Sequence, residues 1–510
     1  MPKSRFRAAV VQTLAALGDI DRNIELLRHH TREAVRQGAE LVVFPECMNT
    51  GYLFDSAEHC RELAEPLDGP FISAMADLCR QYGIHLASGV TELDAVSGKI
   101  YNSGILLDDG GNIAIHYQKQ FLATHDQNWF EVGTKGCPVA DTALGRLGLL
   151  ICFDGRIPEI ARCLALQGAD ALVDMANFFA LDQADLWGPA RAYENGVWLI
   201  AATKSGIERS IYYPGGSTIV DPNGRVIQRI QDNTHGVVTA DIDLELSGKK
   251  QWYTSGHKFN DRRPDAYQIL TKPFADTPVA ELLKEAIVPE QATTKVAPVQ
   301  SHATSEPESW NATVAMVSHA AKLGIKLIAL PEHCTFSTWL PDGELAASQA
   351  EKAELYIEPM SKIASQYGCA IVLPLVQRVD GKLMSTAVLI GPEGETLGQY
   401  EQVHLNPEAK DWAEAGDELR VFETSFGRIG ILLGYDGLFP EAARVLALKG
   451  VEIVVWCCAW RDRVERELLT VSKAEDNRVF VACANRTDCP YPGGSFVVAP
   501  NGLPHWDVNV

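Results

Sequence analysis

Short apolar runs alternate with amphipathic stretches along much of the chain. The runs are rich in Val, Ile and Leu, as is typical of strands buried on both faces of a sheet. The stretches Asn23–Gln37 and Pro70–Gln81 have helical periodicity, and the alternation predicts an α/β fold. The runs predict strands at Ala8–Val11, Leu41–Phe44, His85–Val90, Gly104–Leu107, Leu147–Ile151, Ala171–Met175 and Leu199–Thr203, and the turn residues Asp108–Asn112 favour a hairpin.

One cysteine lies where a predicted strand turns into a helix. The strand ends at Ile151, Cys152 follows in the turn, and Pro158 suits the first position of a helix that stops before Gly168. A side chain at such a turn is exposed at the end of a sheet. Backbone N–H groups nearby can stabilise a thiolate or an oxyanion, so the position favours a nucleophile.

The second half of the chain repeats the motifs of the first half in the same order, and the intervals between matched sites differ by one to three residues. We therefore predict two domains, 5–267 and 296–510, joined by a linker at 268–295 that contains one helical stretch, Val279–Ile287. The matched blocks are Pro45-Glu46 with Pro331-Glu332, Tyr117-Gln118-Lys119 with Tyr400-Glu401-Gln402, Cys152-Phe153-Asp154 with Gly434-Tyr435-Asp436, and Tyr213–Ser217 with Tyr491–Ser495.

Charge and cysteine content narrow the function classes. The formal net charge is −21, and a field of that sign repels phosphate backbones and anionic lipid surfaces, so we expect neither nucleic acid nor membrane as a partner. The 12 cysteines form no C-x-x-C pair and no zinc-ligand spacing, so we expect no metal. The N-terminus does not resemble a signal peptide and no apolar run reaches the ~18 residues of a membrane span. We predict a cytoplasmic protein.

Three residues of the first copy carry complementary chemistry. Singly, Cys152 could be a structural thiol, Glu46 a strand-end surface group and Lys119 a solvated charge. Together they form a useful set, because a thiol needs a base, a carboxylate supplies one, and a cation holds the developing oxyanion.

The motifs Pro45-Glu46, Tyr117-x-Lys119 and Cys152-Phe153-Asp154, in this order, resemble the nitrilase superfamily of carbon–nitrogen hydrolases. The resemblance implies an αββα four-layer sandwich for each domain and a catalytic triad of Glu46, Lys119 and Cys152, with no cofactor. It also suggests that Asp126 stands where the family often has a second glutamate, although His125 is a neighbouring alternative. The backbone N–H of Phe153 is expected to help hold the oxyanion, and Arg156 to brace the cysteine turn.

The second copy is expected to be degenerate. It keeps Glu332, but Gln402 replaces the lysine and Gly434 the cysteine, with Glu408 at roughly the place of Asp126. Glycine offers no nucleophile, so we predict a folded, non-catalytic repeat. The family resemblance further implies that the two copies pair as an internal pseudo-dimer, within a monomer or a larger homo-oligomer. A set of helical residues recurs in both copies and is therefore assigned to the scaffold: Arg191, Glu194 and Asn195, matched by Lys473, Asp476 and Asn477.

The predicted reaction is hydrolysis of a small linear amide or N-carbamoyl amine through a cysteine thioester, with release of ammonia or an amine. Nitrilases of the family resemble Cys-Trp-Glu at the nucleophile, whereas this chain has Cys152-Phe153-Asp154, which favours an amide or carbamoyl substrate over a nitrile. Three alternatives stay open: an N-acyltransferase using the same thioester, a nitrile hydrolase, and a catalytically silent scaffold or binding protein.

Overall fold

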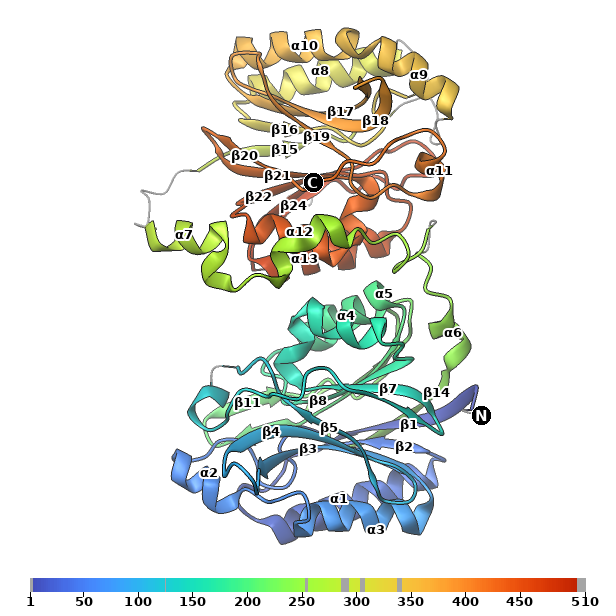
Figure 1. The fold of residues 1–510 in the computed structure, drawn as a ribbon, viewed down its shortest axis with the longest axis vertical. Helices are drawn as coiled ribbons and strands as arrows, with labels where there is room; N and C mark the ends of the chain where they lie inside the picture. Colours follow the sequence, from blue (N-terminus) through green and yellow to red (C-terminus); the bar gives the residue numbers. More distant parts are fainter. Residues whose placement is uncertain are drawn as a thin grey trace. The chain divides into compact units, whose positions relative to one another are not determined.

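The computed structural model describes residues 3–123, 125–252, 256–285, 293–302, 308–336 and 342–501. The chain divides into two compact units, Met1–Lys250 and Gln251–Val510. Among the described residues, each unit contains two sheets of five or six strands and the helices that cover them (Figure 1).

The first sheet of the first unit has six strands in the order β14-β1-β2-β3-β4-β5. Strands β1, β2 and β3 run parallel, while β14, β4 and β5 are antiparallel to their neighbours. The pairing of β4 with β5 confirms the predicted hairpin. The strands are β1 Arg5–Gln12, β2 Leu41–Val43, β3 His85–Leu93, β4 Ile100–Leu107, β5 Ile113–Gln118 and β14 Gly236–Asp243.

Two amphipathic helices cover this sheet, α1 (Ile20–Arg36) and α3 (Pro70–Tyr82), with the short α2 (Ala57–Leu63) nearby. Helix α1 places Leu27 and Ala34 on one face, where they join the core formed with α3 and the sheet. Helix α3 begins with a proline and ends at Gly83 in the left-handed conformation, as its sequence predicts.

The second sheet of the first unit has the order β13-β12-β9-β8-β7-β6, with β7, β8 and β9 parallel, and a two-stranded ribbon, β10-β11, accompanies it. Helices α4 and α5 pack against its strands. The elements are β6 Val139–Thr142, β7 Gly145–Leu150, α4 Pro158–Leu166, β8 Ala171–Ala176, α5 Gly188–Asn195, β9 Trp198–Thr203, β10 Ser205–Glu208, β11 Ile211–Pro214, β12 Thr218–Val220, β13 Val226–Arg229 and α6 Leu244–Gly248.

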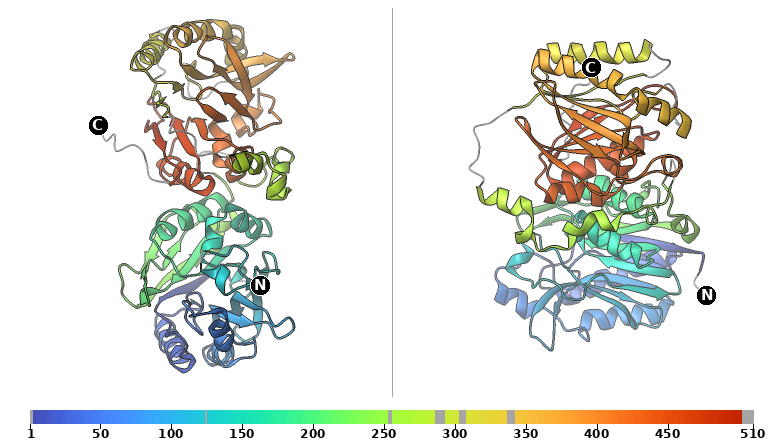
Figure 2. Two further views of the ribbon diagram at one scale, coloured as in Figure 1. Left: turned by 90° about the vertical axis from the view of Figure 1, so that its left-hand side faces the viewer. Right: turned by 45° about the horizontal axis from the view of Figure 1, so that its top comes forward.

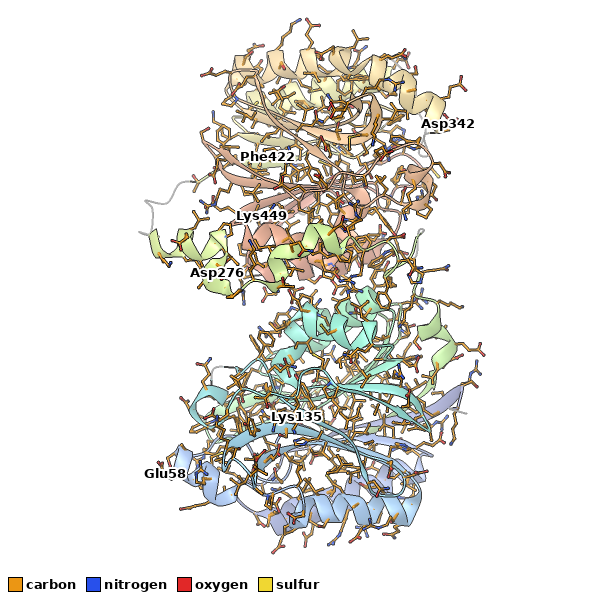
Figure 3. The ribbon with its side chains drawn as sticks, in the orientation of Figure 1. Glu58, Lys135, Asp276, Asp342, Phe422 and Lys449 are labelled. Atoms are coloured by element: carbon orange, nitrogen blue, oxygen red, sulfur yellow. The ribbon has the colours of Figure 1, made fainter. Side chains whose placement is uncertain are left out.

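The first unit is therefore layered as helices, sheet, sheet and helices (Figure 2). Side chains fill the space between the layers (Figure 3). This is the αββα architecture that the family resemblance implies. Charged residues such as Glu58 and Lys135, labelled in Figure 3, are exposed.

The second unit repeats the arrangement with two five-stranded sheets, β15-β16-β17-β18-β19 and β20-β21-β22-β23-β24. Helices α8 and α10 share a core with the first of these sheets. The elements are β15 Val296–Pro298, α8 Glu308–Lys322, β16 Leu327–Ala329, α9 Gly343–Glu351, α10 Ala353–Tyr367, β17 Ala370–Val379, β18 Lys382–Ile390, β19 Thr396–Glu401, α11 Pro407–Lys410, β20 Val421–Thr424, β21 Gly427–Leu433, α12 Pro440–Leu448, β22 Ile453–Cys457, α13 Val471–Asn477, β23 Phe480–Ala484 and β24 Phe496–Val498.

The segment before β15 belongs to the second unit and contains three short helices, η4 (Pro264–Thr271), η5 (Phe274–Asp276) and α7 (Pro278–Glu285). Helices η4 and α7 pack against α12, and the Tyr267 hydroxyl is hydrogen-bonded to His404. Within the described residues, much of the stretch expected to link the copies is thus helical. No described helix combines the length and the apolar character needed to cross a membrane.

Candidate active site

Glu46, Lys119 and Cys152 each follow the end of a strand in the first unit. Glu46 comes after β2, Lys119 directly after β5, and Cys152 opens the short helix η2 (Cys152–Arg156) after β7. The N–H of Glu46 donates to the carbonyl of Ala176 at the end of β8 (3.4 Å), so strand ends from the two sheets meet here. A Cβ at Gly89 of β3 would lie 2.5 Å from the Cα of Glu46, so this close approach requires glycine.

A buried charge cluster joins three of the predicted residues. The Lys119 ammonium lies 2.8 Å from Oε1 of Glu46 and 2.7 Å from Oδ2 of Asp126. All three side chains are almost fully buried. One cation therefore stands between two carboxylates in a region of low dielectric, where each interaction is stronger than in water.

Hydrogen bonds from uncharged donors hold the two carboxylates in place. The Asn102 amide donates to Oε1 of Glu46 (2.6 Å) and to Oδ1 of Asp126 (3.4 Å). Asp126 also accepts from the Tyr52 hydroxyl (2.9 Å) and from the N–H of Ala123 (2.8 Å). Asp126 thus has several donors besides the lysine, as expected of a carboxylate that fixes the position of its neighbour.

Burial and charge act on the cluster in opposite directions. Burial raises the pKa of Glu46, and the Lys119 charge offsets part of that shift. For Lys119, burial works against the ammonium, but Asp126 and Glu46 outweigh it and its pKa stays well above the usual range. The lysine is therefore a permanent cation, while the glutamate is a stronger base than an exposed carboxylate.

The backbone at Cys152 is held in a sparsely populated conformation. Its φ is 51°, in the left-handed region. The Cys152 N–H donates to Oδ1 of Asp174 (2.8 Å). Asp154 closes the turn, because it accepts from the N–H of Ile151 (3.2 Å) and from the Tyr117 hydroxyl (2.7 Å). Burial raises the pKa of Asp154 to about 6.

The thiol of Cys152 is buried among polar groups. Its Sγ lies 3.7 Å from the Asn177 carbonyl and 3.9 Å from Oε1 of Gln183. Burial raises the pKa of this thiol, the Glu46 charge raises it further, and the Lys119 charge lowers it. The carbonyls that the Glu46 N–H and the Cys152 sulfur contact belong to the adjacent residues Ala176 and Asn177, so Glu46 and Cys152 lie at the same strand end. A buried thiol of raised pKa needs a base to become a nucleophile.

A buried polar group of a residue that contacts the thiol is unpaired. Among the described residues, the Asn177 side-chain amide has no hydrogen-bond partner, although Asn177 is fully buried. Such a group is costly unless something pairs with it, so the amide could donate to or accept from a polar ligand.

Sequence reasoning missed Asn102, Asp174, Asn177 and Gln183. The predicted strand Gly104–Leu107 was too short, and the observed β4 extends back to Ile100 and includes Asn102. Asp174 carried a usable signal, since it is an acidic residue inside an otherwise apolar strand. The amides of Asn177 and Gln183 carried none that their local sequence could reveal.

The residues assigned to the scaffold make structural contacts. The Arg156 guanidinium stacks on the Trp187 ring (3.4 Å to the centroid) and lies 3.3 Å from Asp182. Arg191 donates to the Gly155 carbonyl (3.0 Å) and pairs with Glu194, and the Asn195 amide donates to the Arg191 carbonyl (2.9 Å).

The corresponding centre of the second unit contains different residues at the matched positions. Gln402 donates to Oε1 of Glu332 (3.4 Å) and to the Leu433 carbonyl (3.1 Å). A Cβ at Gly434 would lie 2.0 Å from Oε2 of Glu332. The glutamate therefore occupies space that a side chain at 434 would need. Trp456, at the position of Asp174, donates to the Gly434 carbonyl (2.9 Å).

The chain matches a protein-family model twice. The carbon–nitrogen hydrolase model aligns with residues 7–250 and again with residues 295–504. One match falls in each of the two units.

Similar proteins span about half of the chain and nearly all of their own length. A Pyrococcus abyssi protein named nitrilase is 34% identical over 262 residues, which are 51% of this chain and 98% of that protein. An Arabidopsis thaliana N-carbamoylputrescine amidase is 30% identical over 295 residues, 52% of this chain and 97% of that protein. Among solved structures, an amidase from Nesterenkonia sp. aligns with a TM-score of 0.42 at 26% identity, covering 48% of this chain and 92% of that one.

Proposed function

The chain belongs to the carbon–nitrogen hydrolase family, and on this premise we propose that its first unit hydrolyses the carbon–nitrogen bond of a small linear amide or N-carbamoyl amine. The observation that carries the proposal is the buried contact of Lys119 with Glu46 and Asp126 beside the Cys152 turn. The similarity to an N-carbamoylputrescine amidase supports an amide or carbamoyl substrate.

In the first half of the reaction, Glu46 removes the thiol proton and the sulfur of Cys152 attacks the carbonyl carbon. Asn102 and Lys119 occupy Oε1 of Glu46, so we assign proton transfer to Oε2. The tetrahedral intermediate collapses when the carbon–nitrogen bond breaks, and Glu46 returns the proton to the leaving nitrogen. The products of this half are ammonia or an amine and a thioester.

In the second half, Glu46 takes a proton from water and the hydroxide attacks the thioester carbon. The carbon–sulfur bond breaks, the proton passes to the sulfur, and the acid leaves. One carboxylate therefore acts first as a base, then as an acid and then as a base again. Its raised pKa suits both roles, because the group can take up a proton and give it back.

The oxyanion needs donors that are already in place. An ammonium has three N–H groups, and Lys119 directs two of them to Glu46 and Asp126. The third is assigned to the substrate oxygen. The Cys152 N–H is engaged by Asp174, so the second donor is assigned to the next amide, that of Phe153. Asp126 acts through Lys119 and is a positioning residue.

The decisive experiment measures ammonia release from a panel of amides, N-carbamoyl amines and nitriles, with mass spectrometry of the intact protein to detect the thioester. The Cys152→Ala protein should form no acyl adduct and should release no ammonia. A matched control is Cys163→Ala, which removes an exposed cysteine of α4 and should keep full activity. Full turnover in Cys152→Ala would end the proposal.

The same assays separate the alternatives. An N-acyltransferase would form a new amide when an amine acceptor is added, whereas a hydrolase forms the acid with or without the acceptor. A silent scaffold would give no turnover, and a thiol-reactive probe would show no preference for Cys152 over the other cysteines.

We assign no catalysis to the second unit, because Gly434 lacks a nucleophile and Gln402 lacks the lysine charge. The pairing of the two units as an internal pseudo-dimer stays a prediction. Co-expression of residues 1–250 and 251–510 as separate chains tests it: co-purification supports the pairing, and independent soluble monomers contradict it.

A further inference from the structure

A cavity opens in the second unit at the place that corresponds to the Cys152 turn of the first. Its volume is about 60 Å³, which is room for a few water molecules or one small ligand. Glu332 and Gly434 both line it, so it lies at the degenerate centre itself. The absent side chain at 434 leaves the Glu332 carboxylate, rather than a thiol, at the inner wall.

Among the described residues, Glu332 has no lysine beside it, unlike its counterpart Glu46. In the first unit the Lys119 ammonium lies 2.8 Å from Glu46. In the second unit the neutral amide of Gln402 lies 3.4 Å from Glu332. Glu332 is only 7% exposed, so water does little to stabilise its ionised form. An exogenous ammonium group beside it would restore the missing charge pair.

A second carboxyl group, that of Glu465, lies in the same wall. Glu465 begins the π-helix η7 (Glu465–Thr470), at the position that Gln183 holds in η3 (Gln183–Trp187). It is almost fully buried, and it accepts the Arg461 N–H (3.3 Å). Burial raises the pKa of Glu332 to about 8 and that of Glu465 to about 7. Both carboxyls would gain from a cationic partner.

Aromatic rings surround these carboxyls. Trp456 and Trp460 meet edge to face, with centroids 5.5 Å apart. Their indole N–H groups donate to the carbonyls of Gly434 and Gly493, so the polar edges are engaged within the protein. Ring faces attract cations and also accept hydrocarbon. The aromatic members of the wall are Trp412, Tyr435, Trp456, Trp460 and Tyr491.

The cavity also holds positive groups, but acids outnumber them. Burial lowers the pKa of His333 to about 3, so its imidazole is neutral. Arg461 is a cation of the wall, whereas the wall contains three carboxyl groups, those of Glu332, Glu408 and Glu465. When these are ionised, the described wall carries a net negative charge.

We propose that this cavity binds a small alkylammonium ion, whose ammonium group donates to the carboxylates of Glu332 and Glu465 while its hydrocarbon lies against the tryptophan rings. The ligand's ammonium takes the role beside Glu332 that Lys119 has beside Glu46. The second unit is then a binding module for an organic cation, built on the frame of a hydrolase.

The test is calorimetric titration of the full-length Cys152→Ala protein with butylammonium chloride, with tryptophan fluorescence as a second signal. Butan-1-ol, which has the same carbon chain without the charge, is the matched ligand control. We expect binding of the ammonium and none of the alcohol. Absence of butylammonium binding at millimolar concentrations would overturn the proposal, and equal binding of the alcohol would do so too.

Substitutions test whether butylammonium binds in the cavity of the second unit. Glu332→Gln and Glu465→Gln should each weaken butylammonium binding by about tenfold or more, because each removes a charge-assisted hydrogen bond. Glu467→Gln alters an exposed carboxyl of the same η7 helix and should leave binding unchanged. If binding survives both cavity variants and disappears in Glu46→Gln, the ammonium binds in the first unit and the proposal is wrong. Thermal unfolding of each variant confirms that it is folded.

The pH dependence gives an independent readout. Butylammonium stays protonated between pH 6 and 8.5, like a lysine side chain. Glu332 and Glu465 ionise across this range, while Asp436 and the guanidinium groups of Arg461 and Arg486 act on the pKa of Glu332. Binding should therefore tighten as pH rises and should release protons. Affinity that is flat with pH would contradict the assigned contacts.

Discussion

In both units a tyrosine donates a hydrogen bond of 2.7 Å to a buried aspartate in the turn that follows a parallel strand. The pairs are Tyr117 with Asp154 and Tyr400 with Asp436. In both, the aspartate also accepts the N–H of the last residue before the turn. The backbone frame is thus the same, although only one copy holds a cysteine in it. A frame of this kind can be kept when the chemistry it supports is gone.

The difference between the units is one of charge balance. In the first centre the Lys119 ammonium contacts both buried carboxylates directly, whereas the group that contacts Glu332 at the same position of the second is the neutral amide of Gln402. The first centre places a lysine between two carboxylates. The second is a cavity whose described wall contains more carboxyl groups than cations and no lysine. Each of the following substitutions tests this difference between the two centres.

The largest effect is expected from removing the sulfur. Cys152→Ala should lower turnover by about 10⁴-fold or more, because no other group in the cluster can form the covalent intermediate. Steady-state ammonia release measures the loss. The midpoint of thermal unfolding should not fall, since alanine keeps the same backbone turn and removes only a small group.

Glu332→Gln should stabilise the second unit at pH 8.5. The pKa of Glu332 is raised from the ordinary 4.5 to about 8 in the folded protein. The folded state therefore holds this proton more tightly than the unfolded state, and ionisation between these values destabilises the fold by on the order of 4 kcal/mol. Urea unfolding should show the gain at pH 8.5 and none below pH 4.5. An equal gain at both would show that ionisation is not the cause.

Lys119→Gln places the residue of the second unit into the first. It should lower kcat/KM by about 10²- to 10³-fold, because an oxyanion donor and the balancing charge are lost together. Lys135→Gln is a matched control at an exposed position and should have no effect. Comparable losses of kcat/KM in the two variants would mean that the buried lysine has no particular role in the reaction.

Tyr117→Phe and Tyr400→Phe test whether the two frames are equivalent. Each removes a hydrogen bond to a buried aspartate and should cost about 1–2 kcal/mol of unfolding free energy. Denaturant unfolding followed in both variants measures the two losses. A large difference between them would show that the frames, and not only their contents, have diverged.

The smallest effect is expected from Gly434→Cys in the Cys152→Ala background. No ammonia release should appear, because the new Cβ would lie 2.0 Å from the Glu332 carboxylate and no lysine is present. Detectable turnover would show that a thiol alone suffices in this frame.

The sequence was informative where a local pattern determined the structure. Apolar runs located β1, β7 and β8, and the strand-to-helix turn at Cys152 was recognisable from Pro158. Glu46 and Lys119 were each placed at the end of a strand, and in the structure their side chains are in contact.

The rest depended on contacts between segments distant in sequence. Asn102 reaches Glu46 only through the pairing of β4 with β3, and a slip of one residue would turn its side chain to the other face. Asp126 was recognised as a candidate, but its contact with Tyr52 comes from a loop 74 residues away. Similarly, the composition of 268–295 suggested a linker with one helical stretch, Val279–Ile287, whose described part lies in α7. The helices η4 and η5, and the packing of η4 and α7 on α12, were not predicted.

The left-handed backbone at the nucleophile position also bears on how the two copies can change. Cys152 has a φ of 51° and Gly434 a φ of 32°, and only glycine adopts such angles without a steric penalty. Gly434 therefore adopts this backbone without the penalty, and the Glu332 carboxylate occupies the space next to it. A side chain at position 434 would have to bear the penalty and displace Glu332 as well, so a single substitution to cysteine cannot rebuild the first centre in the second unit.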